Sequence, residues 1–226
     1  MNNLLPKINL DFLNGASGST ETTIQLLLLL TILSVAPSIL LLMTCFTRIV
    51  IVLSFVRTSL ATQQMPPNQV LIGIALFLTI FIMGPTFSQI NHDAVKPLID
   101  GKITQQQAYE KGAKPLKEFM TKHTREKDLE LFLNYTKAKK PAHVNDIPMR
   151  VLVPAYAISE LKSAFQMGFM IFVPFLVIDM VVASILMGMG MMMLPPVMIS
   201  LPFKLLLFIL VDGWYLIVKS LLSSYG

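Results

Sequence analysis

Four charged side chains stand within or beside long apolar stretches of the sequence, where a charge is most able to do chemistry: Arg48, Asp179, Lys204 and Asp212. An unpaired charge in a membrane costs about 3 kcal/mol or more, so each of these residues needs a partner or a function. Two carboxylates at one depth could share a proton, as the catalytic pair of an aspartic protease does. The alternative is a structural ion pair that holds helices together, and the residues favour this alternative.

The positions of these charges predict which of them can meet. A helical hairpin that turns near Pro195 would bring Asp179 and Asp212, each about 16 residues from the turn, to similar depth. Lys204 is only about half as far from that turn, so it is predicted to be a poor partner for Asp179 within the hairpin. Arg48, or a charge from another subunit, is the expected partner of Asp179.

Sequence motifs of known catalytic and metal sites are absent from the chain. The local sequences VIDM and VDGW lack the Gly-x-Gly-Asp loop of intramembrane aspartyl proteases, and no histidine lies in an apolar run to assist a membrane serine nucleophile. There is no Gly-x-x-x-x-Gly-Lys phosphate loop and no His-Glu-x-x-His pattern. The sequence therefore predicts a protein that is not an enzyme, with no catalytic residue, no metal site and no cofactor.

A second unusual feature is the methionine stretch GMGMMMLPP, residues 188–196. Met191, Met192 and Met193 follow one another, and helical residues advance by about 100° each, so these three cannot form a single packing stripe. They either contact neighbours all round a helix or are not helical, and the ordinary interpretation is that the soft methionine side chains fill gaps in an irregular core. The flanking glycines would let the chain leave a helix, and the flanking prolines would fix where the next helix begins. These hinge residues are Gly188, Gly190, Pro195 and Pro196.

The composition is that of a membrane protein. Of 226 residues, 54% are hydrophobic and only 14% are charged, against about 25% charged residues in an ordinary soluble domain. The net charge is +5, and the excess lies almost entirely between Thr86 and Arg150. The charges in that region alternate in sign and are not interleaved with stacking aromatic residues, which argues against nucleic acid as a partner. Cys45 is the only cysteine, so no internal disulfide can form.

The pattern of apolar runs predicts an all-α fold with four apolar helices arranged as two hairpins and a polar helical module between them. Residues 1–21 form a polar segment without a clear secretory signal. Residues 22–85 form the first hairpin, 86–154 the module, and 155–226 the second hairpin with the methionine-rich turn. The first apolar helix starts at residue 22 and runs towards residue 55. The second, residues 70–83, is predicted to end at Gly84 and Pro85, at about 14 residues short for a membrane span.

The remaining segments follow from periodicity and from helix-breaking residues. In the module, apolar residues recur at helical spacing over residues 116–123 and 129–133, and KAKKPAHVNDIP is predicted to be a loop. The third apolar helix is predicted to kink near Pro174, and the fourth follows the methionine stretch. Arg57 and Lys204 belong to the two short links, which the positive-inside rule places in the cytoplasm. The module is then extracytoplasmic.

Two kinds of membrane protein fit these features. A small-solute or ion transporter would place its site at broken helices near mid-membrane, and the proline and glycine breaks agree with that loosely. A protein-conducting assembly would explain short, proline-broken apolar helices, because much of their surface would be buried against other subunits. A large ring-like oligomer in mild detergent would favour the second kind, and a monomer or dimer the first.

Two long blocks of the sequence resemble the FliP family of flagellar type III export gate proteins. One is TRIVIVLSFVRTSLATQQMPPNQVLIGIALFLTIFIMGP, residues 47–85, and the other runs from PAYAISELKSAFQ to FILVDGW, residues 154–214. The segment TQQMPPNQV is closer to the flagellar pattern than to that of the injectisome relatives. Ala61 stands where the family usually has glycine.

The resemblance implies a helical assembly of several copies, about five in the family, with FliQ and FliR. It implies that FlhB and FlhA associate from the cytoplasmic side, and that unfolded flagellar subunits pass through the channel. It also places the chain in the bacterial cytoplasmic (inner) membrane as a multi-pass protein of the flagellar basal body. The family's methionine gasket falls on Met191, Met192 and Met193, and no catalysis is implied.

Overall fold

The computed structural model describes residues 41–62, 65–136, 144–191 and 194–226, with isolated positions between 27 and 38. Every regular element among these residues is helical, as the sequence predicted. The predicted polar segment 1–21 lies outside the described residues. In chain order the elements are α3 Phe46–Ser59, α4 Asn68–Ile90, the π-helical η1 Asn91–Val95, α5 Lys96–Ile99, α6 Gln105–His123, α7 Glu126–Tyr135, the 3-10 turn η2 Val144–Asp146, α8 Met149–Gly188, α9 Pro196–Leu210 and α10 Gly213–Ser223.

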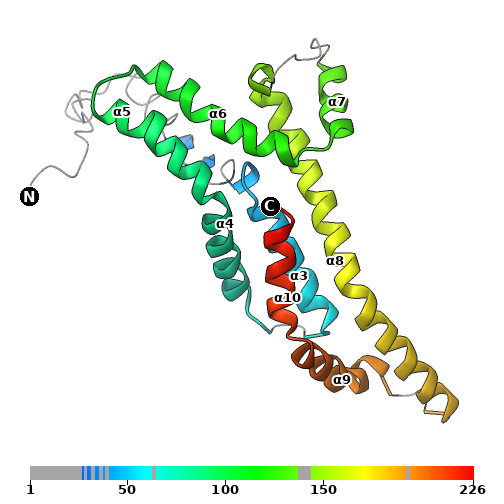
Figure 1. The fold of residues 1–226 in the computed structure, drawn as a ribbon. Helices are drawn as coiled ribbons and strands as arrows, with labels where there is room; N and C mark the ends of the chain where they lie inside the picture. The colour runs from blue at the N-terminus through cyan, green and yellow to red at the C-terminus, as the bar shows by residue number, and fades with distance from the viewer. Residues whose placement is uncertain are drawn as a thin grey trace, which may run out of the picture.

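The central helix is α3, which packs along α8 on one side and α4 on the other. Figure 1 shows α8 running along one side of the molecule, with α3 and α10 beside it and α4 beyond them. Helices α5 and α6 cross the end at which α8 begins, and α9 lies at the other end. The side chains of Ile49, Val52 and Leu53 on α3 are fully buried, so this helix forms the middle of the core.

The second apolar helix is longer than predicted. Helix α4 continues through Gly84 and Pro85 to Ile90, and the helical path then runs on through η1 and α5 to Ile99. A proline inside a helix removes one backbone hydrogen bond, and apolar helices tolerate this where neighbouring groups compensate. The predicted end at Gly84 and Pro85 is therefore wrong. By length and composition, the stretch Asn68–Ile99 could cross a membrane.

Helix α8 is the longest element, with 40 residues from Met149 to Gly188, and it too could cross a membrane. It begins inside the segment assigned to the polar module and continues without interruption through Pro154 and Pro174. The amphipathic segments predicted in the module are confirmed as α6 and α7. Of the predicted loop, residues 144–146 form η2, and residues 137–143 lie outside the described part of the chain.

The fourth apolar helix is broken into α9 and α10, which meet at an angle of 63°. Asp212 lies at the break with a left-handed backbone, φ 51°. A Cβ at Gly213 would lie 2.3 Å from the Phe208 ring, so only glycine allows this close turn. The prediction of one continuous fourth helix is wrong, because the left-handed backbone at Asp212 departs from helical geometry and turns the chain. The bent pair could together form a third span.

The end of α3 carries backbone strain that a substitution should relieve. Ala61 adopts φ 57° just after the helix, a conformation that suits glycine but costs an L-residue with a side chain about 1 kcal/mol. We expect Ala61→Gly to raise the free energy of unfolding by about 1 kcal/mol, measured by denaturation of the detergent-solubilised protein. Gly101→Ala is the matched control. Gly101 also has a positive φ, 70°, and an added Cβ would meet no neighbour, so this variant should lower the free energy of unfolding through backbone strain alone. If neither variant changed the free energy of unfolding, the backbone at Ala61 would not be strained.

Candidate functional site

The first buried charge cluster joins α3, α8 and the C-terminus. Arg48 donates from Nε to Glu160 Oε2 at 3.0 Å and from Nη2 to Oε1, and its Nη1 donates to Ser224 Oγ at 3.1 Å. Tyr225 donates its hydroxyl hydrogen to the same carboxylate. Glu160 has no exposed surface and Arg48 is only 5% exposed. The carboxylate thus receives three charge-assisted or hydroxyl hydrogen bonds, which satisfy a charge that would otherwise be costly to bury.

Tyr225 extends this cluster to the polar module. The Arg48 guanidinium lies 4.1 Å from the centroid of the Tyr225 ring, a cation–π contact. Phe119 of α6 stacks on the same ring with centroids 6.1 Å apart, and His123 meets its edge at 4.9 Å. We call these five residues the tyrosine clamp: Arg48, Phe119, His123, Glu160 and Tyr225. The clamp fastens α6 to α3 and α8 through Tyr225.

His123 should make the clamp sensitive to acid. Burial, with the nearby positive charges of Arg48 and Lys122, lowers the pKa of His123 from 6.5 to about 4. The unfolded chain therefore binds a proton at His123 at higher pH than the folded chain does. The stability that comes from packing the neutral imidazole is complete above pH 6.5 and is lost as the pH falls towards 4. We expect the thermal unfolding midpoint to fall between pH 7.5 and pH 5, and to fall less in His123→Phe, which keeps a ring without the titration. Equal falls in both proteins would contradict this role.

The second charge cluster joins α8, α9 and the end of α3. Lys204 Nζ lies 2.6 Å from Asp179 Oδ2 and donates to the carbonyl oxygen of Ser59 at 3.2 Å. Ser200 donates to Asp179 Oδ1 at 2.5 Å. Lys204 is 2% exposed, whereas the Asp179 side chain keeps 28%. The cluster therefore ties α3, α8 and α9 together.

The prediction that Lys204 is a poor partner for Asp179 is wrong. The helices end and begin at Gly188 and Pro196, not at a sharp turn at Pro195. Asp179 lies nine residues before the end of α8 (188 − 179) and Lys204 eight residues after the start of α9 (204 − 196), so the two charges reach the same depth. Arg48, the expected partner of Asp179, pairs with Glu160 instead.

The structure places Asp212 away from the buried charges, and it adds two residues to the clusters that the sequence analysis did not name. Asp212 is exposed at the bend between α9 and α10, so the structure does not place it among the buried charges. Glu160 and Tyr225 were missed by the sequence reasoning. Glu160 could have been noticed as a carboxylate near the start of the third apolar run, but nothing local distinguishes Tyr225 from an ordinary terminal residue. Only the three-dimensional fold brings these two side chains to Arg48.

The methionine stretch begins with a helix cap. Gly190 has φ 75°, its N–H bonds to the carbonyl of Met187, and the N–H of Met191 bonds to the carbonyl of Leu186, both at 3.0 Å. These two bonds form a Schellman motif, whose left-handed position is best filled by glycine. Gly188 was predicted to let the chain leave the helix, but it is the last helical residue of α8.

The cap and the following prolines determine how the methionines are presented. Pro195 is extended and Pro196 is the first residue of α9, the position at which proline is best tolerated. Met191 is 43% exposed, and Met187 and Met189 are each 60% exposed. Met192 and Met193 lie outside the described residues. The described part of the turn therefore presents methionine side chains on its surface instead of packing them into a core.

Because the resemblance implies a secreting assembly, we expect Asp179→Ala to reduce the amount of assembled complex together with secretion. The change leaves Lys204 almost fully buried without its carboxylate, which costs about 3 kcal/mol or more. Complex recovered in mild detergent and secreted flagellar subunit are the two measurements. The double variant Asp179→Ala with Lys204→Met should recover assembly, because no unpaired charge remains. If Asp179→Ala assembles normally yet blocks export, the pair has a role in conduction and the structural interpretation fails.

Comparison with known proteins identifies the family. A sequence model of the FliP family matches residues 29–221. The flagellar biosynthetic protein FliP of Bacillus subtilis is 71% identical over 219 residues, which cover 95% of this chain and 99% of that protein. The chain belongs to the FliP family. FliP of Caulobacter vibrioides is 50% identical over 218 residues (96% of this chain, 82% of that protein), and FliP of Aquifex aeolicus is 48% identical over 215 residues (94% and 90%).

Membership of the FliP family confirms the resemblance seen in the two apolar blocks. This FliP-family chain has a role in flagellar export and is a membrane-associated flagellar component, in agreement with its long apolar helices. FliP proteins are structural components of export rather than a family of enzymes. Within the residues described, no group of three or more His, Cys, Asp or Glu side chains is arranged to hold a metal ion.

Proposed function

We propose that this chain is a core subunit of the flagellar type III export gate. Several copies assemble with FliQ and FliR into a channel in the bacterial cytoplasmic membrane, and unfolded flagellar subunits pass through it. FlhB and FlhA associate from the cytoplasmic side, and the module built on α6 and α7 faces outward. The family membership supports a role in export, and the exposed apolar faces of α4 and α8 support burial against other subunits.

The observation that carries this proposal is the presentation of the methionine turn. The Schellman cap ends α8 abruptly, Pro195 and Pro196 start α9, and the turn between them carries exposed methionines. The Asp179–Lys204 pair braces α8 against α9 at equal depth behind this turn. Around a symmetry axis, turns held in this way would form a ring of soft apolar side chains, with Met191, Met192 and Met193 as the gasket.

Purification of the chain from its own membranes tests the assembly. We expect it to be recovered in mild detergent as one large particle that contains several copies together with FliQ and FliR, and a strain lacking the chain should not secrete flagellar subunits. A particle of one or two copies without these partners would contradict the channel and favour a small transporter.

A further inference from the structure

Methionine and glycine alternate where α8 ends, and two of these methionines, Met187 and Met189, have no part in the proposed gasket. Met187, Met189 and Met191 are 60%, 60% and 43% exposed. Gly188 and Gly190 stand between them, and a Cβ added at either glycine would lie in open space. The glycines therefore contribute no side chain that could shield the thioether sulfur on either side.

The backbone of this segment has its hydrogen bonds already made. The N–H groups of Met189, Gly190 and Met191 all donate to carbonyl oxygens in the last turn of α8, at 3.1, 3.0 and 3.0 Å. An oxygen atom added to a methionine sulfur is a strong acceptor, and it could take one of these donors only by breaking the cap. The new dipole would therefore face the surroundings of the turn while the helix end stays folded.

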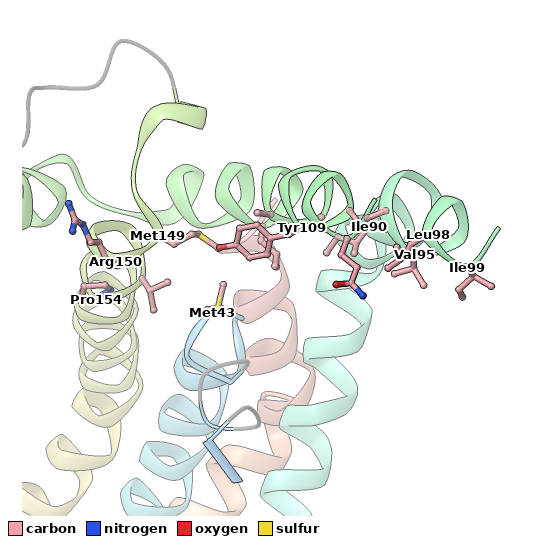
Figure 2. A pocket seen from close by; sticks show the side chains of 16 residues that line it. Met43, Ile90, Val95, Leu98, Ile99, Tyr109, Met149, Arg150 and Pro154 are labelled. Atoms are coloured by element: carbon pink, nitrogen blue, oxygen red, sulfur yellow. The ribbon is translucent and has the colours of Figure 1, made fainter. Parts of the chain in front are cut away.

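Other methionines of the chain are enclosed by the fold. Met83 and Met120 have no exposed surface. Met43 and Met149 line a pocket of about 840 Å³ between α6 and the start of α8, as Figure 2 shows, and Met43 is buried there. Oxidation of a core methionine places a polar oxygen among apolar side chains and disrupts the packing. The same oxidation at the turn would change the polarity of a surface and leave the core intact.

We propose that Met187, Met189 and Met191 form a reversible oxidation site for hydroperoxides. The sulfur lone pair attacks one oxygen of hydrogen peroxide, the O–O bond breaks, and the proton of the transferred hydroxyl leaves with the departing hydroxide as water. The sulfur is oxidised by two electrons to the sulfoxide, and the peroxide is reduced. A methionine sulfoxide reductase reverses the change: the sulfoxide oxygen leaves as water, and two thiols of the reductant are oxidised to a disulfide.

The consequence of this oxidation for transport rests on the proposed channel. A ring of apolar side chains stays closed because it resists wetting. Met191 belongs to the proposed gasket, and Met187 and Met189 lie in the turn that carries it. A sulfoxide is polar where the thioether is apolar, and each copy in the ring would contribute its own dipoles. The oxidised ring would hold water and let ions pass, and reduction would close it again.

Mass spectrometry of the purified complex tests the site itself. The complex in mild detergent is exposed to hydrogen peroxide for increasing times, digested, and analysed for methionine sulfoxide at each position. We expect Met187, Met189 and Met191 to be oxidised about tenfold faster than the fully buried Met83 and Met120, because susceptibility follows exposure. Equal rates at the turn and in the core would overturn the proposal.

Dye release from phosphatidylcholine vesicles that contain the purified complex tests the consequence. We expect hydrogen peroxide to raise the release of a small dye about threefold, and a methionine sulfoxide reductase with dithiothreitol to reverse the rise. Leucine at the three proposed positions has no sulfur to oxidise, so this variant should show no such rise. The matched control carries leucine at Met170, Met180 and Met198, which are exposed outside the turn, and it should respond as the native chain does.

The alanine variant of Met191, Met192 and Met193 separates this inference from the channel. If the turn seals a channel, that variant should release dye without peroxide. If it does so while the native complex carries the sulfoxides and stays closed, the oxidation site has no control over the channel, and only this inference is overturned. If neither releases dye, both are overturned. A rise with peroxide that persists in the leucine variant would place the reactive group elsewhere and would also overturn the inference.

Discussion

Replacing Met191, Met192 and Met193 together by alanine is expected to make cells permeable to a small dye while the complex assembles in normal amount. A channel for unfolded chains must be closed to ions when empty and still let side chains of every size pass. Apolar constrictions resist wetting, and methionine, with three soft torsions, can fill an irregular gap without one required geometry. Alanine removes most of that volume, so water and ions can enter.

Leucine at the same three positions separates sealing from passage. Leucine is apolar and similar in volume but stiffer, so this variant should stay closed to dye yet secrete flagellar subunits more slowly. The matched control replaces three exposed methionines outside the 191–193 stretch, Met170, Met180 and Met198, by alanine. The control should stay closed. If the triple alanine variant at the turn assembles and remains closed to dye, these methionines do not seal a channel and only fill space in the packing.

Arg48→Met is expected to cost about 3 to 5 kcal/mol of folding free energy and to abolish assembly. The change leaves Glu160, which has no exposed surface, without its cation, and it removes the guanidinium from the face of Tyr225. Stability by denaturation and the yield of complex in mild detergent measure the two effects. Tyr225→Phe keeps the ring stack and loses only the hydroxyl, so it should cost about 1 kcal/mol.

The double variant Arg48→Met with Glu160→Leu provides the control for the clamp. If the cost of Arg48→Met comes from an unpaired buried carboxylate, removing that carboxylate should recover most of the stability, because apolar replacement of a buried pair is often neutral. A double variant as unstable as the single one would show that the arginine acts mainly through packing against the tyrosine ring.

The helical and membrane character of this protein could be predicted from local properties. A chain with 54% hydrophobic and 14% charged residues can bury so much apolar surface only in a membrane or in an assembly. The glycine at position 190 and the proline at position 196 have local conformational preferences, so the presence of a turn near the methionines was also predictable. The precise ends of the helices could not be predicted, because the continuation of α4 through Gly84 and Pro85 depends on the surrounding helices.

The partners of the buried charges were decided by the tertiary structure. Asp179 and Lys204 meet because α8 ends at Gly188 and α9 begins at Pro196, so a turn of several residues changes the depth at which each charge lies. Arg48 and Glu160 are 112 residues apart, and Tyr225 reaches them only because the bend at Asp212 and Gly213 directs α10 back along α3 (Figure 1). Composition and periodicity are properties of neighbouring residues. A contact between distant side chains depends instead on the lengths and angles of every helix between them, and those lengths are set by packing.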